Sequence, residues 1–507
     1  MKEKDWFKLK KYPHIGLPVE AKMRHKWIES YVKDPVLIKK HSFLPFIHRV
    51  SKKRRYRKDY DTEGHQILNK ENNIEKDRFV TVKPRELFYA SHLDSLIYSY
   101  YTKLLTEPYE KKLRDFNLEE VVTAYRAIPK DSTVPDGSNK CNVDFANDIF
   151  NLIKKYPEKK FSVITFDIKS FFDNLDHNLL RKIWMEVMDC EKLPLDHFAV
   201  FKNITRFSYV DIQDIFEEYK SEIITQRKSR NGEKLKEKKK KVSKIRFLKS
   251  QNAKAFCLEK EFLENSKKLI KSNKLKKDHN GVLQKRNFGI PQGSPISSIL
   301  ANIYLLHFDK IINDYLKCNN GYYRRYSDDM IVVCPLTKSY EIEQLFYNKI
   351  KDFKLQIQPA KTQNFVFERH LDILKCGQKF SSTINENKNL IYLGFEFDGE
   401  KVLLKSASLA GFYRKMKKSI RRAKYFSFRH KKDMFYRRLY KRFTFRGARK
   451  YKISRWNNLE KKFVMTEQQN WGNFLSYAKK ASNVIDNNAI KKQIKNHWKL
   501  FHKELKK

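Results

Sequence analysis

The chain has 507 residues, enough for about three domains of ~150 residues each. It contains 108 Lys and Arg against 59 Asp and Glu, which gives a net charge of +49. Such an excess costs self-repulsion unless a polyanion neutralises it. A merely basic surface or an anionic membrane would each account for the charge. The 27 Tyr and 37 Phe interleaved with it can stack on bases, and this favours nucleic acid as the partner.

Several other classes of protein are disfavoured. No stretch approaches ~20 apolar residues, and the first residues lack the apolar run of a signal peptide, so we expect no membrane partner. The six cysteines form no CxxC pair, and the 14 histidines show no HExxH spacing. A zinc site or a disulfide framework is therefore not expected, and the cysteine pattern suits a reducing cytoplasm.

The N-terminal third is basic and mixed. The run KKRRYRK at 52–58 is either a solvated loop or a phosphate contact. Residues 87–109 repeat apolar positions with helical spacing, and we expect this helix to end near Pro108. FSVITF at 161–166 is a short apolar run typical of a strand, and it leads directly into Asp167.

The rest of the chain alternates charged and apolar segments. Residues 220–285 are rich in Lys and Glu, which predicts an exposed, partly helical insertion. Residues 286–308 indicate a Gly- and Pro-containing loop followed by a buried helix. RRYSDDMIVVC at 324–334 predicts strand, tight turn and strand, and residues from about 400 to 507 are basic and helical in pattern.

Three aspartates stand where strands are expected to end. Asp167 follows an apolar strand, and Asp328 and Asp329 lie in the turn of YSDD. Carboxylates suit Mg²⁺, and phosphoryl transfer from a nucleoside triphosphate commonly uses two such ions ~3.5–4 Å apart. Taken singly, an Asp after a strand is more often a turn or cap residue, and a DD pair is usually a solvated turn. Because neighbouring strand residues point to opposite faces, we expect Asp328 to share the metals with Asp167 and Asp329 to be more peripheral.

The order of these and other motifs resembles the reverse transcriptase family over roughly residues 80–400. Five matches occur in the family's order, each in a suitable strand, loop or hairpin context, which makes the resemblance specific. They are FDIKSFFDNLDH (166–177, motif A), GIPQGSPISSILANIYL (289–305, motif B), YSDD (326–329, motif C), PAKT (359–362, motif D) and YLGFEF (392–397, motif E), whose Tyr392, Leu393 and Gly394 would form the primer grip.

The resemblance implies an α+β, right-hand polymerase fold with fingers, palm and thumb. We expect a basic, helical N-terminal extension at 1–80, fingers at 81–160 and an antiparallel-sheet palm at 161–400. The palm would include parts of the fingers and the lysine-rich insertion at 220–285. Residues 401–507 would form a basic helical thumb and RNA-binding region.

The resemblance also implies the chemistry of the centre. Two Mg²⁺ ions, with Mn²⁺ as a substitute, would be held by Asp167, Ile168, Asp328 and Asp329. Lys361 resembles the lysine of motif D, a candidate acid for the departing pyrophosphate. A surface lysine without such a role remains the alternative.

Further residues are expected around the nucleotide. VKPREL at 82–87 resembles a group II intron pattern, which places Arg85 at the arginine that grips the triphosphate. AYRAIPK at 124–130 is a partial match that places Arg126 in a similar role. Gln292, Gly293 and Ser294 of motif B would lie beside the incoming nucleotide or template, although Ser and Pro there also suit a helix-entry turn.

Phe172 stands five residues after Asp167, where the family carries a bulky aromatic against the sugar. A phenyl ring offers no hydrogen-bond partner to a ribose 2′-hydroxyl and would leave it buried and unsatisfied. The resemblance therefore implies dNTP substrates and a cDNA product on an RNA template.

The ends of the chain resemble the bacterial defence-associated, or "unknown group", antiphage reverse transcriptases. The relevant stretches are YPHIGL (12–17), HSFLPFIHR (41–49) and NFLSYAKKA from residue 473. The high positive charge suits a co-encoded structured noncoding RNA. An intron maturase or retroelement enzyme without an endonuclease, and a non-catalytic RNA-binding scaffold, remain alternatives. A homo-oligomer also stays open.

Overall fold

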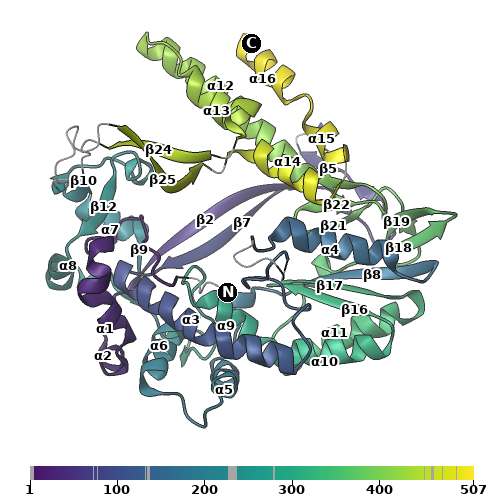
Figure 1. Cartoon of the computed structure of the whole chain (residues 1–507), viewed down its shortest axis with the longest axis horizontal. Coiled ribbons are helices and arrows are strands. Elements are labelled where there is room, and N and C mark those ends of the chain that lie inside the picture. The colour runs from purple at the N-terminus through teal and green to yellow at the C-terminus, as the bar shows by residue number, and fades with distance from the viewer. Residues whose placement is uncertain are drawn as a thin grey trace.

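A computed structural model describes residues 5–507 apart from 72–73, 77, 132, 134–137, 227–236, 278–279, 450, 458–461, 471 and 487. It is an α+β structure centred on a six-stranded sheet of order β16-β17-β8-β18-β19-β20, in which every pairing is antiparallel (Figure 1). The strands are β8 (Lys160–Asp167), β16 (Tyr322–Tyr326), β17 (Asp329–Pro335), β18 (Gln363–His370), β19 (Ile373–Lys379) and β20 (Ile384–Asn385).

Both faces of this sheet are buried, which explains the unbroken apolar run of β8. Because side chains alternate along a strand, Val163 and Val333 join one core while Ile164 and Val332 join the other. Helix α4 covers the first face, and α9, α10 and α11 contribute to the second core (Figure 1). Their bounds are α4 (Asn142–Lys155), α9 (Ser297–Tyr304), α10 (Leu306–Cys318) and α11 (Ser339–Asp352).

A long two-stranded ribbon spans the boundary between the expected N-terminal extension and the expected fingers. It consists of β2 (Phe46–Arg57) and β7 (Phe79–Tyr89). Its root pairs with β9 (Ser208–Asp211), and β13 (Lys271–Ser272) completes a sheet of order β13-β9-β2-β7. The basic run at 52–58 therefore lies mostly on a strand. The N-terminal region was expected to be helical, but this ribbon follows its short helices. These short helices include α1 (Glu29–Lys33) and α2 (Pro35–Lys40).

The helix expected at 87–109 is shifted along the chain. Helix α3 runs over His92–Asp115. It begins later than expected because Leu87 to Tyr89 pair with β2 instead, and it continues past Pro108. Ser91 caps its N-terminus by accepting a hydrogen bond from the Asp94 N–H at 3.2 Å. Local periodicity could not reveal that the first apolar residues, 87–89, form part of a strand.

The lysine-rich segment at 220–285 is not exposed throughout, as its charge led us to expect. Its described part contributes β10 (Ile223–Gln226), β11 (Glu237–Lys240) and β12 (Ala253–Cys257) to a sheet of order β1-β12-β10-β11, in which β1 is His14–Ile15. Phe256 and Phe262 are fully buried in a small separate core. Part of the run at 233–244 lies outside the described residues.

The C-terminal region begins with a three-stranded sheet of β21 (Leu390–Tyr392), β22 (Phe395–Phe397) and β23 (Val402–Leu404). Helix α12 (Ser406–His430) follows and projects from the body beside α16 (Figure 1). An unexpected hairpin interrupts the helices. The remaining elements are α13 (Tyr436–Phe443), β24 (Tyr451–Asn457), β25 (Lys462–Asn470), α14 (Phe474–Val484), α15 (Asn488–Ile494) and α16 (His497–Lys506). Within the described ranges, no helix has the length and apolarity to cross a bilayer.

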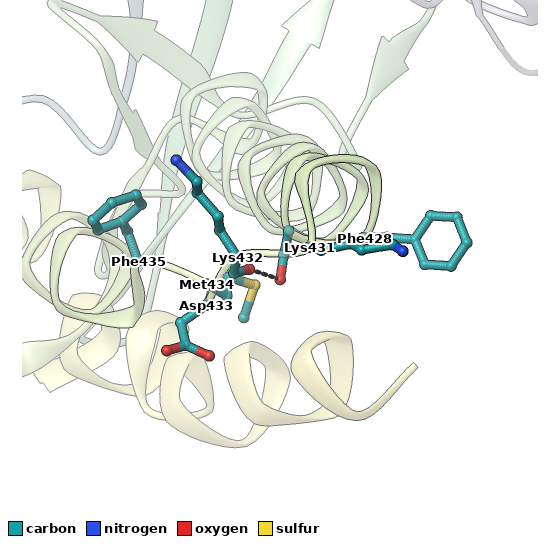
Figure 2. Close-up of a pocket in the computed structure, with 7 residues that line it drawn as sticks. Phe428, Lys431, Lys432, Asp433, Met434 and Phe435 are labelled. Carbon is teal, nitrogen blue, oxygen red and sulfur yellow. Dashed lines mark hydrogen bonds between the residues drawn. The ribbon is translucent and has the colours of Figure 1, made fainter.

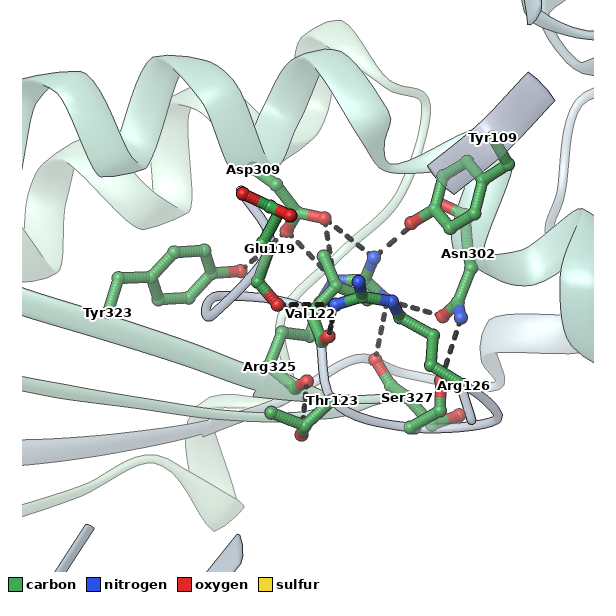
Figure 3. Close-up of polar contacts among 11 residues, drawn as sticks. Tyr109, Glu119, Val122, Thr123, Arg126, Asn302, Asp309, Tyr323, Arg325 and Ser327 are labelled. Atoms are coloured by element: carbon green, nitrogen blue, oxygen red, sulfur yellow. Dashed lines mark hydrogen bonds and ion pairs between the residues drawn. The ribbon is translucent and has the colours of Figure 1, made fainter. Parts of the chain in front are cut away.

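A fully buried ion pair ties the central sheet to α10 (Figure 3). The Arg325 Nη2 atom lies 2.6 Å from Asp309 Oδ2, and Arg325 Nε donates to the two carboxylate oxygens at 2.8 and 2.9 Å. The Tyr323 hydroxyl donates to the same carboxylate at 2.9 Å. The charge of Arg325 is thus matched and hydrogen-bonded inside the protein, as a buried charge requires.

The same guanidinium reaches the YSDD turn. Its Nη1 donates to Asn302 Oδ1 of α9 at 3.2 Å and to the Ser327 carbonyl at 3.3 Å. The Arg325 carbonyl accepts from the Thr123 N–H and hydroxyl, both at 3.0 Å. One side chain therefore joins α10, α9 and the turn, while its backbone joins the segment at 121–126.

We expect Arg325→Met to lower the free energy of unfolding by about 3–5 kcal/mol, because it leaves the Asp309 carboxylate buried without its positively charged partner. The double variant Asp309→Leu with Arg325→Met should lose less than the single one. Arg324→Met is the matched control, since Arg324 pairs with the exposed Glu120 and should cost about 0–1 kcal/mol. Urea unfolding measures all three variants. Equal losses for Arg325→Met and Arg324→Met would contradict this role of the pair.

Candidate active site

Strand register brings two of the predicted aspartates together. Asp167 is the last residue of β8, Asp329 is the first residue of β17, and the two lie directly opposite each other. Facing residues on adjacent antiparallel strands have Cβ atoms ~4.5–5.5 Å apart on the same face. The Asp167 carbonyl accepts from the Gln358 N–H at 2.8 Å, which fixes the end of β8.

Asp328 lies in the turn that joins β16 and β17. Tyr326 pairs with Asp329, so Ser327 and Asp328 form the two-residue loop, and Ser327 has a φ of 61°. The Asp328 carbonyl accepts from the N–H of Ile168 at 3.4 Å. Asp329 and Asp167 thus share one face of the sheet, while the division of roles between Asp328 and Asp329 stays a prediction.

The carboxylates influence one another electrostatically. Asp329 is exposed to solvent along part of its surface. Desolvation by the surrounding protein raises the pKa of its carboxyl group to about 6, and the negative charges of Asp328 and Asp167 add to this effect. Lys361, at the end of a 3₁₀ turn (Pro359–Lys361), forms an ion pair with Asp167. Lys361 therefore offsets the charge of Asp167, and a further cation would be favoured at the Asp328–Asp329 side of the centre.

The donor chemistry fits a hard divalent cation, although the side chains are not gathered around one point. In the part of the chain that the structure describes, no group of three or more His, Cys, Asp or Glu side chains is close enough to hold a metal ion. Asp167 is instead neutralised by Lys361. Metal binding would thus have to displace this lysine and draw the carboxylates together.

The motif B loop packs tightly on two other segments. Gly293 has a φ of 121°, and a Cβ there would lie 2.6 Å from the Phe88 carbonyl oxygen of β7. The Phe88 N–H donates to the Gln292 carbonyl at 2.8 Å. Gly289, with a φ of 89°, would bring a Cβ within 2.7 Å of the Asp173 carbonyl oxygen. Both positions require glycine, since any other side chain would push the fingers or motif A away.

Phe172 lies beside this loop, in a short 3₁₀ turn (Phe171–Asp173) that follows β8. Its carbonyl accepts from the Ile290 N–H at 2.8 Å, and its ring is half-buried against the central core. The preceding Ser170 has a φ of 47°, which turns the chain sharply after β8. The predicted sugar-facing residue is thus fixed between motifs A and B.

The two predicted arginines differ in their availability. Arg85 is exposed on β7, opposite Ser51. Arg126 is nearly buried, and its guanidinium contacts both carboxylate oxygens of Glu110 at 2.9 and 2.6 Å and donates to the Val122 carbonyl at 2.6 Å. The donors of Arg126 are therefore occupied by its own chain, and a nucleotide contact would require breaking this ion pair.

The predicted primer grip forms the turn between β21 and β22. Tyr392 pairs with Phe395, and Leu393 and Gly394 between them have φ values of 45° and 91°. These angles suit a tight type I′ hairpin. Tyr392 is buried, and burial together with the negative charge of Asp329 raises the pKa of its hydroxyl. The turn therefore lies close to the carboxylates, on the side of the C-terminal sheet.

One residue near the motif B loop, Arg286, was missed. Arg286 donates to Asn273 Oδ1 at 2.5 Å and to the Phe288 carbonyl at 3.0 Å, which braces the entry to the loop. The Ser294 hydroxyl is buried and has no hydrogen-bond partner in the structure. A basic residue directly before a Gly- and Pro-rich loop was the available signal for Arg286. Ser294 was expected beside the incoming nucleotide or template, and that role stays a prediction.

Comparisons with known proteins bear on this arrangement. The family model "Reverse transcriptase (RNA-dependent DNA polymerase)" matches residues 96–397. Among solved structures, telomerase from Candida albicans in complex with a telomeric RNA fragment is 14% identical, with a TM-score of 0.33, and the match covers 78% of this chain and 53% of that one.

Apo telomerase from Candida tropicalis is 12% identical with a TM-score of 0.34, over 80% of this chain and 57% of that one. The chain thus spans somewhat more than half the length of these structures. No curated protein matches. The family model covers more than half of the sequence, with motifs A to E inside it or at its edge, and the chain has the right-hand polymerase fold. The chain belongs to the reverse transcriptase family.

Proposed function

We propose that this chain is an RNA-directed DNA polymerase that builds cDNA from dNTPs on an RNA template. The observation that supports this proposal most directly is the pairing of Asp167 with Asp329 at the ends of β8 and β17, beside the turn that carries Asp328. Phe172 follows Asp167 by five residues, and its carbonyl accepts a hydrogen bond from the Ile290 N–H of the motif B loop.

In this proposal, Asp167, Asp328, Asp329 and the backbone of Ile168 hold two Mg²⁺ ions, with Mn²⁺ as a substitute. When bound, the ions would supply activation of the primer 3′-hydroxyl and stabilisation of charge on the pyrophosphate. Lys361 leaves Asp167 and donates a proton to the departing pyrophosphate.

The remaining residues orient the substrates. Gly293 and Gln292 present backbone to the nucleotide and template, and Phe172 excludes a ribose hydroxyl. Arg85 contacts the triphosphate from the ribbon, where its exposed guanidinium has the geometry for phosphate oxygens. Tyr392, Leu393 and Gly394 hold the primer end.

The biological setting that we propose is antiphage defence together with a co-encoded structured noncoding RNA. The net charge of +49 supports a large polyanionic partner. Sequencing of the nucleic acids that co-purify with the protein tests this setting. Recovery of one RNA and its cDNA from the wild type, with RNA alone from an Asp329→Asn variant, is the expected result. An intron-derived RNA would favour the maturase alternative.

Asp167→Asn and Asp329→Asn should each lower dNTP incorporation by at least ~10²-fold, because each removes a carboxylate that would hold the metal ions. Asp372→Asn is the matched control, since Asp372 is exposed at the far end of the same sheet, beyond β18. Primer extension on an RNA template measures the rates. Undiminished extension by both variants would refute the polymerase proposal, and phage protection that survives in them would favour the scaffold alternative.

Phe172→Ala should lower the preference for dNTPs over rNTPs by about 10–100-fold, since the ribose hydroxyl would then be hydrated instead of buried without a partner. The measured quantity is the ratio of kcat/KM for dATP and ATP on the same primer–template. The kcat/KM for dATP should change much less than that for ATP. An unchanged ratio would remove Phe172 from the sugar site.

Lys361→Gln should lower kcat by about 10²-fold with little change in the KM for dNTP, as expected when a general acid is lost. Single-turnover kinetics at saturating Mg²⁺ separate this effect from metal binding. If only the Mg²⁺ concentration for half-maximal rate changes, Lys361 acts as a counterion of Asp167 and is not the acid.

A further inference from the structure

The end of α12 and the loop after it carry aromatic side chains that stand in solvent. Phe428 is 87% exposed and Phe435 is 82% exposed. Tyr425, Phe426 and Tyr436 are each more than half exposed, at 57%, 57% and 52%. We call these five residues the aromatic tip. Exposed aromatic groups gathered at one place are unusual unless they meet a partner.

The surface at the aromatic tip is hollowed. A depression of about 660 Å³ is lined by residues 427–428 and 431–435. Figure 2 shows the Phe428 and Phe435 rings on opposite sides of the loop, with the Lys432 side chain between them. The Ser427 hydroxyl donates to the Lys432 carbonyl at 2.5 Å, and this contact holds the loop against the end of α12.

The charge around the aromatic tip is mostly positive, and Asp433 is an acidic residue in its loop. Residues 406–432 contain ten lysines and arginines and no Asp or Glu. Phe412, Met416 and Ile420 form the buried stripe of α12, so most of the basic side chains are left on its outer faces. Alternating cations and exposed rings suit a nucleic-acid strand, since phosphates bind the former and bases stack on the latter.

The aromatic tip is far from the carboxylates along α12. This helix has 25 residues, which corresponds to a length of about 37 Å. At ~3.4 Å per nucleotide, that length equals roughly ten nucleotides of a strand. The tip is thus too distant to contact the nucleotide being added or the primer end.

We propose that the aromatic tip binds an unpaired segment of RNA, with bases stacked on Phe428 and Phe435 and phosphates near Lys431 and Lys432. The inference rests on the proposed polymerase function for its choice of RNA. The DNA product leaves paired with its template, and the unpaired strand available to the enzyme is therefore RNA. A second copy of this chain is a poorer fit, because two such cationic surfaces repel each other.

The test compares the full-length wild type with the double variant Phe428→Ala and Phe435→Ala. Both side chains are mostly exposed, so the thermal unfolding temperature should not change. Binding of a labelled unstructured RNA oligonucleotide, measured by fluorescence anisotropy without dNTP, should weaken about ten-fold or more. Tyr340→Ala is the matched control, since Tyr340 of α11 is 73% exposed, and it should leave binding unchanged.

Fully paired RNA should bind both proteins equally. Unchanged affinity for the unpaired RNA in the double variant would overturn the proposal, as would an equal loss for paired RNA or a loss confined to DNA of the same sequence. Wild-type self-association that disappears in the variant, with RNA binding intact, would instead assign the tip to a contact between copies. A wild type that binds through the tip but extends no primer would refute only the polymerase function.

Discussion

The pairing of β8 with β17 forces carboxylates that repel each other into proximity, and the rest of the structure has to hold them there. Asp167 and Asp329 face each other across two central strands, and Asp328 follows in the adjoining turn. Such an arrangement destabilises the folded state unless positive charge is supplied. Lys361 supplies part of it through its ion pair with Asp167. Desolvation, followed by the charges of Asp328 and Asp167, raises the pKa of the Asp329 carboxyl group, and we interpret the negative charge of this cluster as the basis for cation binding.

The rest of the fold holds this unfavourable centre in place. Arg325 and Asp309 form a buried ion pair whose remaining donors reach Asn302 and the Ser327 carbonyl, immediately before the aspartates. On the other side, the Gln292 carbonyl of the motif B loop accepts a hydrogen bond from the Phe88 N–H of the β2–β7 ribbon. Helices, ribbon and turn therefore cannot move independently. Buried polar networks of this kind require every partner, which makes them strong constraints on position.

The palm and its candidate site were predictable from the sequence because their signals are local. The strand before Asp167 and the turn at YSDD are each determined by a few adjacent residues. Residues whose roles depend on distant partners were not predictable. Arg126 resembles a phosphate-binding residue, yet Glu110 occupies it. The helix expected from Leu87 lost its first residues to pairing with β2, since only the tertiary fold decides between the two states.

The central claim is that the facing carboxylates bind divalent cations together. Titration with Mn²⁺, followed by the electron paramagnetic resonance signal of the free ion, measures this binding directly on the protein with primer–template and dNTP bound. The account predicts that Asp167→Asn and Asp329→Asn each lose ions that the wild type binds, while Asp372→Asn keeps them. Equal Mn²⁺ stoichiometry and affinity in all four proteins would contradict it.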